Sequence, residues 1–187
     1  MDTFETLAGS VAERDALERL RAATGGPDGP MERHCLRVRL IAAALGVKQG
    51  WALDGELLTV AAILHDIGIY PSVSDAGVYT AQGAALAREL LAGHGWSQER
   101  IDRCADAIDR HHELRPQLAR GAEVEAIRRA DLVDVSGGIL TFGLDHGWLR
   151  ELARGVPRRG FARELMRLVS HALRTRPLTM LQIFRRP

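Results

Sequence analysis

Apolar residues recur every three or four positions along most of this 187-residue chain, and this spacing restricts the fold more than any other feature of the sequence. Such spacing places apolar side chains on one face of an α-helix. No stretch shows the alternation of apolar and polar residues that is typical of strands. We therefore predict an all-α fold, a compact bundle of about seven to nine helices that forms one domain over residues 1–187.

Breaks between the predicted helices are marked by glycine and proline. Residues 3–22 read as the first helical stretch, and the segment GGPDGP at 25–30 ends it. Pro30 suits the first turn of the next helix, because a missing N–H costs little there. Residues 67–79 contain glycine, proline and serine and are predicted to form a loop.

Other helix starts are predicted from side chains that cap the first turn. Asp54, Thr80 and Ser97 each precede or open an apolar-periodic segment, and their side-chain oxygens can accept a hydrogen bond from a free backbone N–H. Two late helices are expected around residues 146–154 and 161–174. The last of these is amphipathic and rich in arginine, so we expect it either to be solvated or to form a homodimer.

Several ionisable residues lie in predicted helices whose other residues are mostly apolar. His65 and Asp66 end the apolar run LLTVAAIL at 57–64. Burying these two side chains away from water costs several kcal/mol unless they are paired with each other or bound to a metal. The other ionisable residues in largely apolar helical segments are His34, His111, His112 and Asp131. Taken singly, each could be a helix-end charge or a solvated residue, but their joint occurrence on separate apolar helices favours one shared site.

A site made of imidazoles and carboxylates suits Mn, Fe, Co, Ni or Zn, and it lacks the thiolates of a structural zinc site. Cys35 and Cys104 are too few for a disulfide framework and are expected to be reduced, buried residues of a cytoplasmic protein. The formal net charge of +1 gives no overall field that would attract nucleic acid or a membrane. We therefore expect neither a membrane nor a nucleic-acid partner.

The ordered set of motifs resembles the HD-domain superfamily of metal-dependent phosphohydrolases. The resemblance covers about residues 30–140 and leaves a C-terminal helical extension at 141–187. It is carried by RHCLRV with His34, AAILHDIG with His65 and Asp66, AIDRHHE with His111 and His112, and RRADLVD with Asp131.

This resemblance implies roles for the same residues. One divalent metal ion would be held by His34, His65, Asp66 and Asp131, and the ion lowers the pKa of a bound water to about 7 in favourable cases. Asp66 would also orient that water and take its proton, and His111 would protonate the leaving oxygen. His111 and His112 match positions that bind substrate or, in members with two metals, a second ion. We assign His112 to the substrate, which is expected to be a small phosphorylated molecule such as a nucleotide.

Two departures from the superfamily pattern matter. Gln82 stands where members with two metals carry a further histidine, which favours a single ion. Ile69 and Tyr70 follow HDIG where many members have lysine or glutamate, so Arg37 and Arg115 are the candidates for binding phosphate, unless they are solvated helix residues. A hydratase of a small nitrile such as cyanamide, or a nucleotide sensor without turnover, therefore remains open.

The segment after residue 135 lies largely outside the motifs. Its glycine-rich part, SGGILTFG, is read either as one wall of the pocket or as a plain helix connection. His94, His146 and His171 have no comparable setting and are expected to be surface residues.

Overall fold

The computed structural model describes residues 3–73, 77–175 and 177–182, and within those residues it contains helices and no strand. The all-α prediction is confirmed. The helix count slightly exceeds the predicted range because α1 and α10 are only 4 and 6 residues long. The α-helices are α1 (Phe4–Leu7), α2 (Val11–Thr24), α3 (Pro30–Gln49), α4 (Gly55–Leu64), α5 (Tyr79–Gly93), α6 (Gln98–Asp109), α7 (Ala122–Val135), α8 (His146–Gly155), α9 (Phe161–Thr175) and α10 (Pro177–Gln182).

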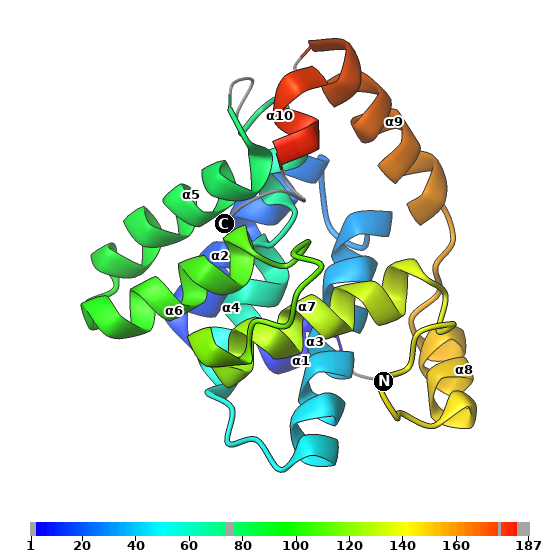
Figure 1. Cartoon of the computed structure of the whole chain (residues 1–187). Coiled ribbons are helices and arrows are strands. Elements are labelled where there is room, and N and C mark those ends of the chain that lie inside the picture. The colour runs from blue at the N-terminus through cyan, green and yellow to red at the C-terminus, as the bar shows by residue number, and fades with distance from the viewer. Residues whose placement is uncertain (1–2, 74–76, 176, 183–187) are drawn as a thin grey trace.

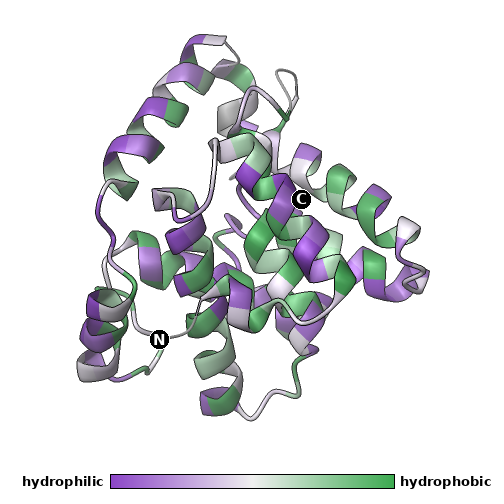
Figure 2. Ribbon diagram, turned by 180° about the vertical axis from the view of Figure 1, so that it is seen from behind, coloured by the Kyte–Doolittle hydropathy of each residue, from purple (hydrophilic) through white to green (hydrophobic). Residues whose placement is uncertain are grey.

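Helix α4 is the centre of the bundle. All of its residues from Leu57 to Leu64 are buried, and α2, α3, α6 and α7 pack around it (Figure 1). Hydrophobic residues gather where these helices meet, whereas α8 and α9 at the edge carry many hydrophilic residues (Figure 2). A fully buried central helix explains why the run before His65 is continuously apolar. No helix of the described residues is both long enough and apolar enough to cross a membrane.

The predicted helix starts are mostly confirmed. Pro30 occupies the first turn of α3, and the side chains of Asp54 and Ser97 accept hydrogen bonds from the backbone at the starts of α4 and α6. The prediction for Thr80 was wrong. Helix α5 begins one residue earlier, and the Thr80 hydroxyl donates to Asp109 on α6 at 3.0 Å.

The first helical stretch is two helices. A capping box separates them: the Ser10 side chain accepts from the backbone of Glu13 at 3.1 Å, and the Glu13 carboxylate accepts from the backbone of Ser10 at 2.8 Å. The predicted loop at 67–79 also holds a short 3₁₀ helix, Ile67–Ile69. Both differences arise from local hydrogen bonds that apolar spacing does not report.

The amphipathic helix at the end of the chain packs on the bundle. Phe161, Leu168 and Ala172 of α9 are buried, so one face of the amphipathic helix lies against the rest of the chain. Dimer formation through this helix stays a prediction. Its opposite face is exposed at Met166, among other residues.

Asp54 ties the start of α4 to α6, and its removal should weaken the fold in a pH-dependent way. Two hydrogen bonds from Arg100, of 2.6 and 2.8 Å, hold the pKa of Asp54 below its usual range against the effect of burial. A depressed pKa means that the stabilisation is present above about pH 4 and is lost as the pH falls through the folded-state value.

We expect Asp54→Ala to cost about 1–2 kcal/mol at neutral pH, the usual range for a lost cap. Urea unfolding of both proteins between pH 7 and pH 3 measures this. The gap between them should stay constant above about pH 5 and shrink below about pH 4. Arg100→Ala should reduce the pH dependence in the same way. A gap that widened in acid would contradict this account.

Candidate metal centre

Three helices bring the four predicted ligands together at one point inside the bundle. His34 comes from the second turn of α3, His65 and Asp66 directly follow α4, and Asp131 comes from α7. All four are buried. His111, just beyond α6, is buried beside them. The structure therefore groups the residues that the sequence analysis placed in one site.

Distances between the ligand atoms are those expected around a single cation. The His34 Nε2 atom lies 3.1 Å from His65 Nε2, 3.6 Å from Asp66 Oδ2 and 3.4 Å from Asp131 Oδ1. His65 Nε2 lies 3.5 Å from Asp66 Oδ2 and 3.9 Å from Asp131 Oδ1. Around an ion bound at about 2.1 Å, neighbouring ligand atoms are roughly 3.0–3.4 Å apart. Small adjustments would bring these atoms to that spacing.

Hydrogen bonds fix which imidazole nitrogen faces the centre. His34 Nδ1 donates to Asp134 Oδ2 at 2.7 Å, because an ionised carboxylate only accepts. His65 and His111 donate from Nδ1 to backbone carbonyls three residues earlier, at 2.8 and 2.7 Å. In the neutral rings, the three Nε2 lone pairs therefore point into the cluster. This is how ligand histidines are held in metal sites.

A cation fits this donor set. The lone pairs of His34 and His65 face each other at 3.1 Å, a repulsive arrangement unless a proton or a cation lies at that point. Among the described residues, His111 Nε2 and Asp131 Oδ1 are buried atoms without a hydrogen-bond partner. Buried polar atoms of this kind are rare in folded proteins. A mixed nitrogen and oxygen set without sulfur suits a divalent transition metal.

The carboxylates of the cluster carry negative charge at neutral pH. Burial favours the neutral acid, yet the surrounding imidazoles hold the pKa of Asp66 well below its usual range, and His34 and its neighbours lower that of Asp131. In turn, burial would lower the pKa of His34, but Asp131 and Asp134 outweigh it and raise the pKa to about 9. The cluster thus attracts positive charge to the point where the Nε2 atoms meet.

The position of Arg37 does not match its predicted contact with substrate. Its side chain is only 1% exposed, and it donates to both oxygens of Asp134 at 2.7 and 2.9 Å. Its remaining nitrogen donates to the carbonyls of Val156 and Pro157. Arg37 holds Asp134, and Asp134 orients His34. Sequence reasoning overlooked Asp134, although it lies in RRADLVD three residues after Asp131 and so on the same helix face.

The residue of helix α5 that contacts the cluster is Tyr79, and not Gln82 as the sequence suggested. The Tyr79 hydroxyl donates to Asp66 Oδ1 at 3.3 Å and contacts His112 Nε2. Gln82 instead lines a groove with Asp15 of α2. Gly68 makes this possible, since a Cβ there would lie 2.0 Å from the carbonyl oxygen of Tyr79. The argument for one metal that rested on Gln82 therefore loses its structural basis.

The remaining predicted residues lie at the outer edge of the cluster. His112 is 22% exposed, and its Nδ1 lies 3.6 Å from Asp131 Oδ2. Arg115 is exposed on the loop that follows. Together, His111, His112 and Asp131 form a second group of possible ligands that shares members with the first.

One wall of the site comes from the C-terminal extension. The Phe161 ring stacks on His34, with centroids 4.3 Å apart and planes inclined by 17°. Glu164 accepts a hydrogen bond from Tyr70, which follows HDIGI. Helix α9 therefore forms this wall, while the glycine-rich segment SGGILTFG, read either as a wall or as a helix connection, follows Asp134 at the end of α7.

Comparison with known families agrees with this geometry. The family model for the HD domain matches residues 31–136, which is more than half of the chain and includes all the cluster residues. No curated protein matches the chain. The match ends before α8, so the wall formed by α9 lies outside it. Over the matched residues the sequence resemblance is confirmed, and the chain belongs to the HD domain family.

Proposed function

We propose that the protein is a divalent-metal-dependent hydrolase that acts on a small phosphorylated molecule. The observation that carries the proposal is the convergence of three imidazole Nε2 atoms and two ionised carboxylates in a buried cluster. We further propose that His34, His65, Asp66 and Asp131 hold one ion. When bound, a divalent ion polarises the substrate and lowers the pKa of a water molecule.

The chain's own residues then handle the protons. Asp66 is ionised, and its two oxygens face different sides: Oδ2 faces His34 and His65, while Oδ1 faces Tyr79 and His111. It can therefore orient a water molecule and accept its proton. Burial opposes protonation of His111, but the neighbouring Asp66 raises its pKa above the usual value. His111 is thus suited to hold a proton at Nε2 and to give it to a leaving oxygen.

His112 is better suited to contact substrate than to donate a proton. Burial and the neighbouring His111 lower its pKa to about 4, so the ring is neutral at pH 7. Its partial exposure leaves part of the ring open to a ligand. Arg115, exposed on the adjacent loop, would reach the phosphate group from solvent.

A second candidate activity is hydration of a small nitrile such as cyanamide. Arg37 is buried and engaged by Asp134. Among the described residues, no arginine or lysine side chain contacts the cluster of His34, His65, Asp66 and Asp131. A phosphate dianion is normally matched by such cations, so a small neutral substrate also fits this charge distribution.

The test combines metal analysis with two assays. Protein purified without chelator is expected to contain about one transition-metal ion per chain, to hydrolyse at least one compound of a phosphate-ester panel, and to lose this activity with chelator. Cyanamide hydration is measured on the same samples. If only cyanamide were turned over, the protein would be a nitrile hydratase and not a phosphohydrolase. Tight nucleotide binding without turnover would make the protein a sensor, and absence of metal would refute the proposal.

Removing the Tyr79 hydroxyl should weaken catalysis more than metal binding. Tyr79→Phe keeps the ring but deletes the contacts with Asp66 and His112. We expect turnover to fall about 10–100-fold, as for other residues that orient metal ligands, with metal content unchanged. Tyr70→Phe is the matched control, because its hydroxyl contacts Glu164 instead. Wild-type turnover in Tyr79→Phe would show that the Tyr79 hydroxyl has no role.

A further inference from the structure

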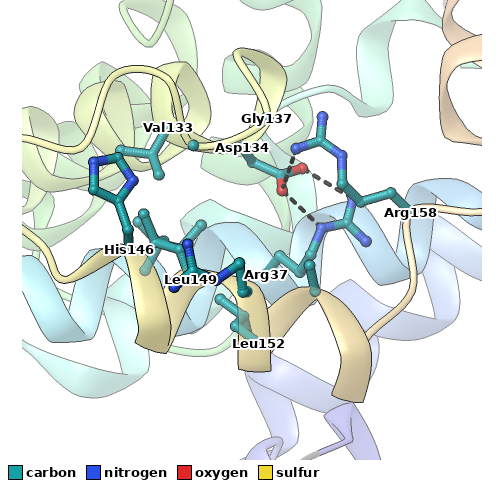
Figure 3. Close-up of a pocket in the computed structure, with 12 residues that line it drawn as sticks. Arg37, Val133, Asp134, Gly137, His146, Leu149, Leu152 and Arg158 are labelled. Carbon is teal, nitrogen blue, oxygen red and sulfur yellow. Dashed lines mark hydrogen bonds and ion pairs between the residues drawn. The ribbon is translucent and has the colours of Figure 1, made fainter.

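A second pocket adjoins Asp134 but is lined by none of the cluster residues. It encloses about 240 Å³ between α3, the end of α7 and α8. Figure 3 shows Asp134 and Arg158 on one side of it and His146 on the other. The basic residues that line it are Arg37, His146, Arg150 and Arg158.

The pocket carries more positive than negative charge. Asp134 is its only acidic lining residue among those the structure describes, and Arg37 already engages both of its oxygens. Arg158 makes only a 3.6 Å contact with the same carboxylate and a 3.5 Å hydrogen bond to the carbonyl of Val135. Arg150 forms no ion pair within the described part of the chain. Two guanidinium groups therefore remain to neutralise a ligand.

The shape of the pocket adds an apolar surface to these charges. Ile41, Leu149 and Leu152 line it together with the basic groups. The Arg158 side chain is 32% exposed, and His146 and Arg150 are exposed, so a ligand can reach the pocket from solvent. A few polar groups around an apolar lining are typical of small-molecule sites. The volume restricts the ligand to an anionic group and a few carbon atoms.

We propose that this pocket binds a small molecule that carries a phosphate or phosphonate group on a short carbon skeleton. Guanidinium groups pair with tetrahedral oxyanions through two parallel N–H donors, and Arg150 and Arg158 supply them here. The imidazole of His146 adds a donor on the opposite side. The apolar floor takes the carbon skeleton. This assignment does not depend on what the metal centre hydrolyses.

Titration calorimetry of the metal-loaded protein with propylphosphonate tests the proposal. We expect a saturable site that persists after the metal is removed with chelator, whether or not the loaded metal centre binds a second phosphonate. Arg158→Ala and Arg150→Ala should each raise Kd about tenfold or more, because each deletes a charge-assisted contact. Arg159→Ala and Arg154→Ala are matched controls: both residues are exposed neighbours that do not line the pocket, and Kd should stay unchanged.

Melting temperatures confirm that each variant is folded, and Arg150→Ala changes only an exposed side chain. Three results would overturn the proposal. The first is the absence of saturable binding. The second is the same Kd in Arg158→Ala and Arg150→Ala as in their controls. The third is loss of all binding on chelation, which would assign the phosphonate to the metal centre.

Discussion

Asp66→Ala is expected to lose the metal, nearly all turnover and part of the stability at once. The carboxylate lies 3.6 Å from His34 Nε2 and 3.5 Å from His65 Nε2, and its other oxygen contacts Tyr79. In the proposed mechanism Asp66 both ligates the ion and accepts the proton of the water molecule, so its loss removes two contributions to catalysis. We therefore expect turnover to fall on the order of 10³-fold or more, as for the central members of other catalytic groups.

Stability should fall because the remaining ligands stay buried without their cation. Unsatisfied buried groups cost about 1–3 kcal/mol, which lowers the melting temperature by several degrees. Elemental analysis, turnover and thermal unfolding are compared for wild type, Asp66→Ala and Asp66→Asn, with and without chelator. Asp102→Ala removes an exposed carboxylate that pairs with Arg88, far from the cluster in its contacts, and should leave metal content and turnover unchanged.

The three readouts separate the alternatives. A hydrolase loses metal, turnover and melting temperature together, whereas a nucleotide sensor loses metal and ligand affinity with no wild-type turnover to lose. A purely structural helix-end pair would give a modest stability change and no metal effect. If chelator leaves the wild-type melting temperature unchanged and no metal co-purifies, the metal centre itself is refuted.

The sequence was sufficient for the parts of the site that depend on local order. Apolar spacing identified the helices, and Asp54 and Ser97 marked two of their starts because capping is a short-range interaction. The grouping of His34, His65 and Asp131 followed from a chemical argument: charged groups on apolar helices need a common partner. Asp134 could also have been predicted from the sequence, because a spacing of three residues places it beside Asp131 on α7.

Contacts between distant segments were not predictable in this way. Phe161 stacks on His34, although the two residues are 127 positions apart in the sequence. No local sequence pattern predicts that α9 packs against α3. Tyr79 reaches Asp66 because Gly68 lets the start of α5 approach closely. The contact of Arg37 with Asp134 was unpredictable for the same reason, because the two residues lie 97 positions apart.

Arg37→Met is expected to destabilise the fold by about 3–5 kcal/mol, the usual cost of removing one partner of a buried ion pair. Methionine fills a similar volume, so the loss is mainly electrostatic: Asp134 would keep a buried charge. The surrounding contacts with His34 and Arg37 hold the pKa of Asp134 well below its usual range despite burial. Urea unfolding measures the change. Metal affinity should also fall about 10–100-fold, because Asp134 orients His34.

A double-mutant cycle isolates the ion pair from simple packing. Arg37→Met should cost clearly less in an Asp134→Asn background than in wild type, since the charge that Arg37 neutralises is then absent. Arg39→Met is the matched control on the same helix: Arg39 donates to the Thr59 hydroxyl at 2.8 Å, and its loss should cost about 1 kcal/mol. Equal costs in both backgrounds would mean that Arg37 only fills space. If instead Arg37→Met raised KM at unchanged stability and metal content, Arg37 would be a substrate-binding residue after all, and the placement of its side chain against Asp134 would be wrong.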